Sequence, residues 1–355
     1  MDRPRIPQRV RIALIAAGTL AAFAYVLWNA DTAPSRRAAA SAETPRRVIL
    51  FHDGPDGLVV AGPGLGQVGD VAAAPTGAVY VLDVEWNRLS VYAPDGTPQI
   101  VGQPGRQRGE FGRPVGLALD GDGRLYVLDP GNRRLEVFAL GGTAHAHSIE
   151  LGWSPADLCI AGRRLFLLGS REEKLIHEAS LLDGRVLRSF APDSALRRLG
   201  MERYLANGYL HCDGEGITFL PHYRGQVERY SAATGELLGS LPIPDYRAAR
   251  VRPDGNAYVD WEAPDGGRHS RGAAMVGLPD GRLLVQVGII PLHGQDSELD
   301  SIRSYLVSWP ERRIREAGES LPRIMAVRGD TGFAALKDTV PRVPLAGLLA
   351  EGGTR

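Results

Sequence analysis

Five charged or titratable residues could line one small site, because each stands near the start of a stretch of apolar sequence. They are Asp70, Arg113, Asp157, His211 and Arg323. Carboxylate and imidazole groups can hold a divalent metal if Asp70, Asp157 and His211 converge. Nothing in their spacing requires this convergence, so a channel lined by mixed charges is the alternative. We interpret the five as channel or ligand candidates and assign no catalytic residue and no metal ligand.

The remaining histidines show no recognised metal spacing. His145 and His147 lie two residues apart, so we expect their side chains to share one face of an outer strand or turn, without a role as a site. His222, His269 and His293 fall in presumed loops. There is no G-x-S-x-G nucleophile motif, no phosphate-binding loop and no C-x-x-C pair. The sequence therefore predicts no cofactor, with a divalent metal in the channel as the alternative.

The two cysteines, Cys159 and Cys212, leave the redox state open. They fall near the same position of neighbouring repeats. A bridge needs Cα atoms within about 7 Å, and neighbouring strands can be farther apart than that. We expect two buried thiols, with a disulfide in an oxidising compartment as the alternative.

Composition indicates a turn-rich globular protein. The chain has 355 residues with 44 glycines, 25 prolines and 44% apolar residues, which is unlike a disordered segment. Its formal net charge is zero, so no basic footprint predicts a nucleic-acid partner.

The elements that must position the candidate residues come from an internal repeat. The segment RLYVLDPGNRRLEVF at 124–138 matches AVYVLDVEWNRLSVY at 78–92 after a shift of 46 residues. A period of 40–50 residues built from short strands and turns is typical of a β-propeller blade. A middle strand lies between two neighbouring blades, so residues 125–128 should be apolar continuously and buried on both faces. Because Asp83, Asp129, Arg88 and Arg134 recur, we expect them to form structural hydrogen bonds between blades.

Fainter copies bring the number of blades to six. Blade starts are expected near residues 66, 112, 153, 207, 272 and 321, with insertions at 245–271 and 289–300. The last blade is one strand short. We expect residues 48–51 or 58–60 to pair with it and close the ring. The sequence thus predicts an all-β, six-bladed propeller over residues 47–350, followed by a tail at 351–355.

The segment at 102–142 resembles an NHL repeat, including the G-x-F-x-x-P entry formed by Gly109, Phe111 and Pro114. The first blade fits well after its first strand, and the later four fit loosely. The resemblance implies a six-bladed NHL-type propeller. That group contains protein-binding scaffolds and a few enzymes, so fold does not settle function.

The N-terminus has the pattern of a signal anchor. A basic segment at 1–11 precedes the uncharged stretch 12–28, which is at the short end of a bilayer span. Tyr25 and Trp28 suit the membrane interface, and the preceding arginines favour an N-terminus inside. A cleaved signal peptide is the alternative. A linker at 29–46, with a span of about 25 Å as a flexible coil, would keep the propeller near the periplasmic face of the cytoplasmic membrane.

Two loops are candidates for partner binding. One is acidic, with Asp296, Glu298 and Asp300, and the other is basic, with Arg312 and Arg313. The favoured function is a non-enzymatic, membrane-tethered propeller that binds or stabilises a membrane or periplasmic protein complex, such as an envelope or electron-transfer assembly. The alternative is a metal-dependent propeller enzyme, a lactonase or lyase, acting on a small exported substrate.

Overall fold

The computed structural model describes residues 47–48, 60–61, 64–139, 141–192, 206–248, 250–253, 259–262, 268–291, 301–317, 321–336 and 338–350. The expected membrane span with Tyr25 and Trp28, the acidic loop with Asp296, Glu298 and Asp300, and His293 lie outside these ranges. None of the helices in the described ranges is long and apolar enough to cross a bilayer.

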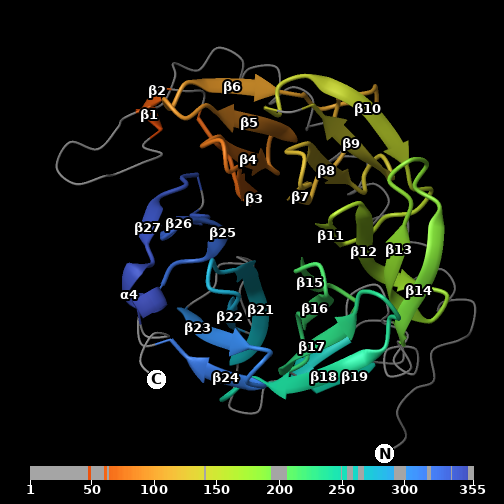
Figure 1. Cartoon of the computed structure of the whole chain (residues 1–355), viewed down its shortest axis with the longest axis vertical. Coiled ribbons are helices and arrows are strands. Elements are labelled where there is room, and N and C mark those ends of the chain that lie inside the picture. The colour runs from red at the N-terminus through yellow and green to blue at the C-terminus, as the bar shows by residue number, and fades with distance from the viewer. Residues whose placement is uncertain are drawn as a thin grey trace, which may run out of the picture. The chain divides into compact units, whose positions relative to one another are not determined.

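Six antiparallel sheets stand around a common axis, each with its first strand innermost (Figure 1). Blade 1 contains β3 (Val68–Ala73), β4 (Val79–Asp83), β5 (Arg88–Tyr92) and β6 (Pro98–Val101). Blade 2 contains β7 (Gly116–Leu119), β8 (Leu125–Asp129), β9 (Arg134–Phe138) and β10 (His145–Glu150). Blade 3 contains β11 (Asp157–Ala161), β12 (Arg164–Arg171), β13 (Lys174–Ala179) and β14 (Val186–Pro192).

The second half of the ring is less regular. Blade 4 contains β15 (Gly208–Cys212), β16 (Gly216–Pro221), β17 (Gln226–Ser231) and β18 (Leu237–Pro242). A hairpin of β19 (Arg250–Pro253) and β20 (Val259–Glu262) follows it within the expected insertion. Blade 5 contains β21 (Arg268–Gly277), β22 (Leu283–Pro291), β23 (Ser301–Ser308) and β24 (Arg313–Glu316). Blade 6 has β25 (Ile324–Arg328), β26 (Thr331–Ala334) and β27 (Arg342–Pro344), and the short helix α4 (Ala346–Ala350) follows.

The six-bladed, all-β architecture is confirmed. The middle strand β8 is buried at all five positions, as its unbroken apolar sequence predicts. Among the described residues, a cluster of buried apolar side chains fills each interface between neighbouring blades. Burial of these side chains on both faces of each blade is the main source of stability.

The strand predicted to close the ring, at 48–51 or 58–60, is described only at Val48 and Val60, since residues 49–59 lie outside the described ranges. At these two positions the predicted pairing with blade 6 is not found. β1 (Arg47–Val48) pairs with β2 (Val60–Ala61), and neither pairs with blade 6, which has three strands. Instead Phe333 and Val340 of blade 6 pack against Val71, Val79 and Val81 of blade 1. In the described residues, blades 6 and 1 therefore meet through buried apolar side chains and not through a shared sheet.

Candidate functional site

One residue of each innermost strand reaches the same level of the central channel. Five of these residues occupy the same position in the first strand of their blade, because each pairs with the corresponding residue of the second strand. They are Asp70, Gly116, Asp157, Tyr209 and Ala274. Arg323, next to β25, takes the sixth place. A cavity of about 220 Å³ lies at this level, and Asp70, Asp157, Tyr209, Ala274 and Arg323 line it.

The two carboxyl groups come from blades 1 and 3 and approach the same small residue of blade 2. A Cβ atom on Gly116 would lie 3.5 Å from Oδ1 of Asp157 and 3.8 Å from Oδ2 of Asp70. Each carboxyl group also links its blade to the next one, since the Leu117 amide donates to Asp70 at 2.7 Å and the Leu210 amide donates to Asp157 at 2.6 Å. Because Gly116 has no side chain, the carboxyl groups of Asp70 and Asp157 can both lie beside it.

Both channel carboxyl groups hold protons more tightly than usual. The surrounding protein displaces bulk water although part of each residue faces the cavity. This burial raises the pKa of Asp70 to about 6 and that of Asp157 to about 8. The negative charge of Asp70 adds to the rise at Asp157, whereas the Arg323 guanidinium partly offsets the rise at Asp70.

The opposite half of the channel carries hydrogen-bond donors. The Arg323 guanidinium donates from Nε to the Ala273 carbonyl at 2.9 Å and from Nη2 to the Tyr209 hydroxyl at 3.2 Å. The Tyr209 ring meets His222 edge-on, with ring centroids 5.2 Å apart. His222 also lines the cavity and is 8% exposed, and within the described ranges its Nε2 has no hydrogen-bond partner. Burial, followed by the positive charges of Arg271 and Arg323, lowers its pKa to about 3.

The structure therefore brings together three of the five channel candidates, Asp70, Asp157 and Arg323. Arg113 is exposed and does not line the cavity; its backbone amide donates to Asp129 at 2.8 Å. His211 also lies outside the lining, since its ring packs against Gly277 of blade 5. Burial lowers the pKa of His211.

Sequence reasoning missed Tyr209 and His222. The repeat register could have found Tyr209, which takes the position of Asp70 in the fourth blade. His222 could not be found this way, because it follows β16 in a segment that reads as a loop. Its amide donates to the Asn207 carbonyl at 3.0 Å, and this bond holds the residue inside the ring.

The described residues contain no cluster of three or more His, Cys, Asp or Glu side chains arranged to hold a metal ion. A metal held by Asp70 and Asp157 would have to displace the proton that the raised pKa of Asp157, about 8, favours at neutral pH. A metal in the channel stays an untested alternative.

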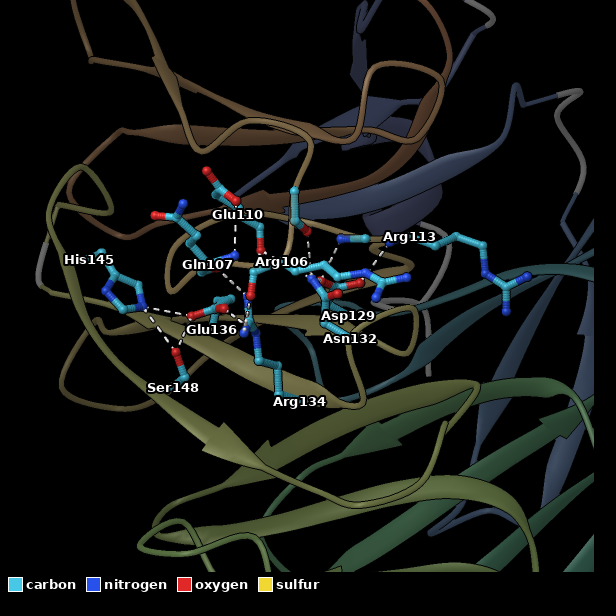
Figure 2. A network of polar contacts seen from close by, with 12 residues as sticks. Arg106, Gln107, Glu110, Arg113, Asp129, Asn132, Arg134, Glu136, His145 and Ser148 are labelled. Atoms are coloured by element: carbon cyan, nitrogen blue, oxygen red, sulfur yellow. Dashed lines mark hydrogen bonds and ion pairs between the residues drawn. The ribbon is translucent and has the colours of Figure 1, made fainter. Parts of the chain in front are cut away.

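The recurring aspartates and arginines have the structural role that their repetition predicts. Asp129 accepts hydrogen bonds from the Gly112 amide at 2.7 Å and from the Asn132 side chain at 2.7 Å (Figure 2). Arg134 donates to the Arg106 and Glu110 carbonyls, each at 3.0 Å. These bonds do not join two blades directly. They hold the loop that arrives from blade 1 and enters the inner strand of blade 2.

A second polar cluster surrounds Glu136 in the same blade. Its carboxylate lies between Arg134 and the pair His145 and Ser148, whose side chains contact Oε2 at 2.6 and 2.7 Å (Figure 2). The expectation that His145 and His147 share a face is wrong. A bulge between them pairs His145 with Phe138 and His147 with Val137, which are on opposite faces of β9.

The expectation of two free thiols is also wrong. Cys159 of β11 and Cys212 of β15 form a disulfide with a Cα–Cα distance of 5.7 Å. The innermost strands of a propeller converge toward the axis, and the bond between Asp157 and the Leu210 amide holds these two close. Their spacing therefore falls within the usual range for a disulfide.

Two outer strands expose leucines. Leu187 of β14 and Leu238 of β18 are 54% and 51% exposed, and the neighbouring Leu182 and Leu237 are 89% and 57% exposed. Leu187 and Leu238 occupy equivalent bulges, each skipped by the pairing with the preceding strand. The basic candidates are both exposed: Arg312 lies in the turn between β23 and β24, and Arg313 begins β24. The Arg312 guanidinium lies beside Gly239 of β18.

No protein-family model matches the sequence, and no curated protein matches it significantly. Solved structures match in fold. A structural-genomics protein from Bacteroides thetaiotaomicron is 12% identical, with a TM-score of 0.52 over 82% of this chain and 72% of that chain. U3-55K is 9% identical, with a TM-score of 0.51 over 83% of this chain and 93% of its own. A streptogramin B lyase is 12% identical, with a TM-score of 0.48 over 79% and 94%. At such low identities the two likenesses with TM-scores above 0.5 show the propeller fold alone.

Proposed function

We propose that this chain is a non-enzymatic binding propeller of NHL type, tethered to the cytoplasmic membrane, that docks on a membrane or periplasmic protein complex. The observation that carries the proposal is the repeated bulge of blades 3 and 4. It leaves Leu187 and Leu238 exposed at equivalent places on the outer strands of two neighbouring blades. A bulge at a sheet edge redirects a side chain, and exposed apolar groups on adjacent elements suit a protein partner.

Two further features support the location. The Cys159–Cys212 disulfide suits an oxidising compartment outside the cytoplasm. The basic and then apolar N-terminal sequence has the pattern of an anchor that leaves the rest of the chain outside. A short linker between the two would confine the propeller to partners in or on the same membrane.

Recovery of a partner tests the proposal. The full-length protein, tagged in its native cells, is extracted in mild detergent, sized, and its co-purifying proteins quantified. Burial of a leucine side chain contributes about 1.5–3 kcal/mol, so Leu187→Ser combined with Leu238→Ser should lower partner recovery by roughly tenfold or more. Ile100→Ser is the matched control, because Ile100 is 43% exposed on the outer strand β6 of blade 1, far from either bulge in sequence.

The proposal fails if the wild-type protein is a monomer without a partner, or if the control variant loses the partner as fully as the double variant. The enzyme alternative is separable in the same samples. A metal-dependent enzyme would bind a stoichiometric divalent ion, and its melting temperature would rise on addition of calcium or zinc.

A further inference from the structure

The channel cavity has two chemically different halves. Blades 1 and 3 contribute the carboxyl groups of Asp70 and Asp157, whereas blades 4 and 6 contribute the donors of Tyr209, His222 and Arg323. Gly116 and Ala274 occupy the equivalent positions of blades 2 and 5, so small side chains lie between the two halves. A ligand that spans this cavity meets acceptors at one end and donors at the other.

Arg323 lacks an ionic partner in the part of the chain that the structure describes. Its ion-pair distance to every described carboxylate exceeds 4 Å, and its two printed acceptors, the Ala273 carbonyl and the Tyr209 hydroxyl, are uncharged. A guanidinium has five donors, so three remain for another group. An arginine in a protein-lined cavity favours an anion, above all a carboxylate, which it can bind with two parallel hydrogen bonds.

His222 gives an independent sign of a missing acceptor. The Arg271 guanidinium lies 3.5 Å from Nδ1 and has only hydrogens to offer, so it favours the neutral tautomer with the proton on Nε2. The residue lines the cavity, and its Nε2 atom is buried and has no hydrogen-bond partner among the described residues. Buried polar atoms are nearly always hydrogen-bonded, so an unpartnered donor at a cavity indicates a ligand or water acceptor.

The acidic half has capacity left for donors. Each carboxyl group accepts one bond from a neighbouring blade. The Asp70 carboxylate has about four acceptor sites, and Asp157 accepts at its carbonyl oxygen even when it is protonated. Two carboxyl groups near one another bind a group with several hydrogens well, and a primary ammonium has three. The cavity volume of about 220 Å³ has room for roughly seven non-hydrogen atoms, each counted as the volume of one water molecule.

We propose that the channel cavity binds a small zwitterion, with a carboxylate held by Arg323 and His222 and a primary ammonium held by Asp70 and Asp157. This ligand keeps the charge of the site balanced. A simple anion would leave the carboxyl groups without a cation, and a simple amine would leave the guanidinium without an anion. The site is separate from the leucines of the outer strands, so it stands whether or not the proposed docking occurs.

Calorimetric titration of the full-length protein in detergent micelles tests the proposal. The probes are glycine, β-alanine, 4-aminobutanoate and 5-aminopentanoate, which differ only in the distance between their charged ends. At least one should bind, and butanoate and butylammonium should bind at least tenfold more weakly than the preferred zwitterion. Arg323→Gln and Asp70→Asn should each weaken binding of that zwitterion at least tenfold, since each removes the charge at one end of the site.

Matched variants outside the cavity separate binding from folding. Arg113→Gln and Asp122→Asn change exposed residues of the same types and should leave the affinity unchanged. Circular dichroism establishes whether each variant is folded. If Arg323→Gln does not fold, Asp70→Asn, which keeps the size of the side chain, tests the acidic end of the site by itself. The proposal is overturned if no zwitterion binds at 10 mM, if butanoate binds equally well, or if both folded cavity variants keep wild-type affinity.

Discussion

Loss of the disulfide should lower the stability of the propeller by an amount that can be calculated from its place in the chain. The bridge links residues 53 apart on the inner strands of blades 3 and 4. A loop of that length gives a stabilisation of about 4 kcal/mol from the restricted unfolded state. With about 2.1 cal/mol/K of unfolding entropy per residue and roughly 300 folded residues, the melting temperature should fall by about 6 °C.

The assay compares three forms of the full-length protein by scanning calorimetry. These are the oxidised wild type, the wild type after reduction, and Cys159→Ala combined with Cys212→Ala. The reduced wild type isolates the covalent link, because its side chains are unchanged. The double variant adds the loss of two sulfur atoms, one of them in the buried cluster between blades 3 and 4.

Reductant should shift the wild type and leave the double variant where it is. The reasoning is refuted if protein purified without reductant shows two free thiols after denaturation. It is equally refuted if reduction leaves the melting temperature within 1 °C of the oxidised form.

Two further predictions concern buried carboxylates. Asp157 faces Asp70, Arg323 and His222 across the cavity. Its pKa is about 8, whereas that of an unfolded aspartate is near 3.8. Between these two pH values the folded state therefore keeps a proton that the unfolded state releases. The free energy of unfolding, measured in urea, should therefore fall as the pH rises from 6 to 8. Asp157→Asn should flatten this dependence on pH, and an unchanged slope would contradict the raised pKa of Asp157. Asp129→Ala should lower the free energy of unfolding by about 3 kcal/mol, because two loop amides lose a charged acceptor. The exposed Asp122→Ala is its control, and an equal loss in both variants would count against the clamp.

The fold was predictable because each blade of a propeller repeats the same sequence pattern of apolar strands and turns. Residues 78–92 and 124–138 carry the same apolar strands and turn, and a strand buried on both faces must be apolar without interruption. The same repetition identified Asp83 and Asp129 as structural, since a residue needed once in every blade serves the blade. Local sequence could not show that their bonds go to the entry loop of the same blade.

The candidate site was predictable only in part. Asp70, Asp157 and Arg323 were found because each stands at the entrance of an inner strand, where side chains face the axis. His222 was not, because its place depends on how the segment after β16 folds back over blade 4. The bulge at His145 was missed for a similar reason, since an extra residue in a strand leaves no mark on its apolar pattern.

By itself, the sequence determined the number of blades, the buried middle strands and which recurring residues are structural, because each of these is visible in the repeated pattern of apolar strands and turns. Only the tertiary structure decided how the described ring closes, that Cys159 meets Cys212, and which side chains share the channel. Those outcomes depend on the distance between neighbouring blades at the axis, which is set by the packing of all six interfaces together.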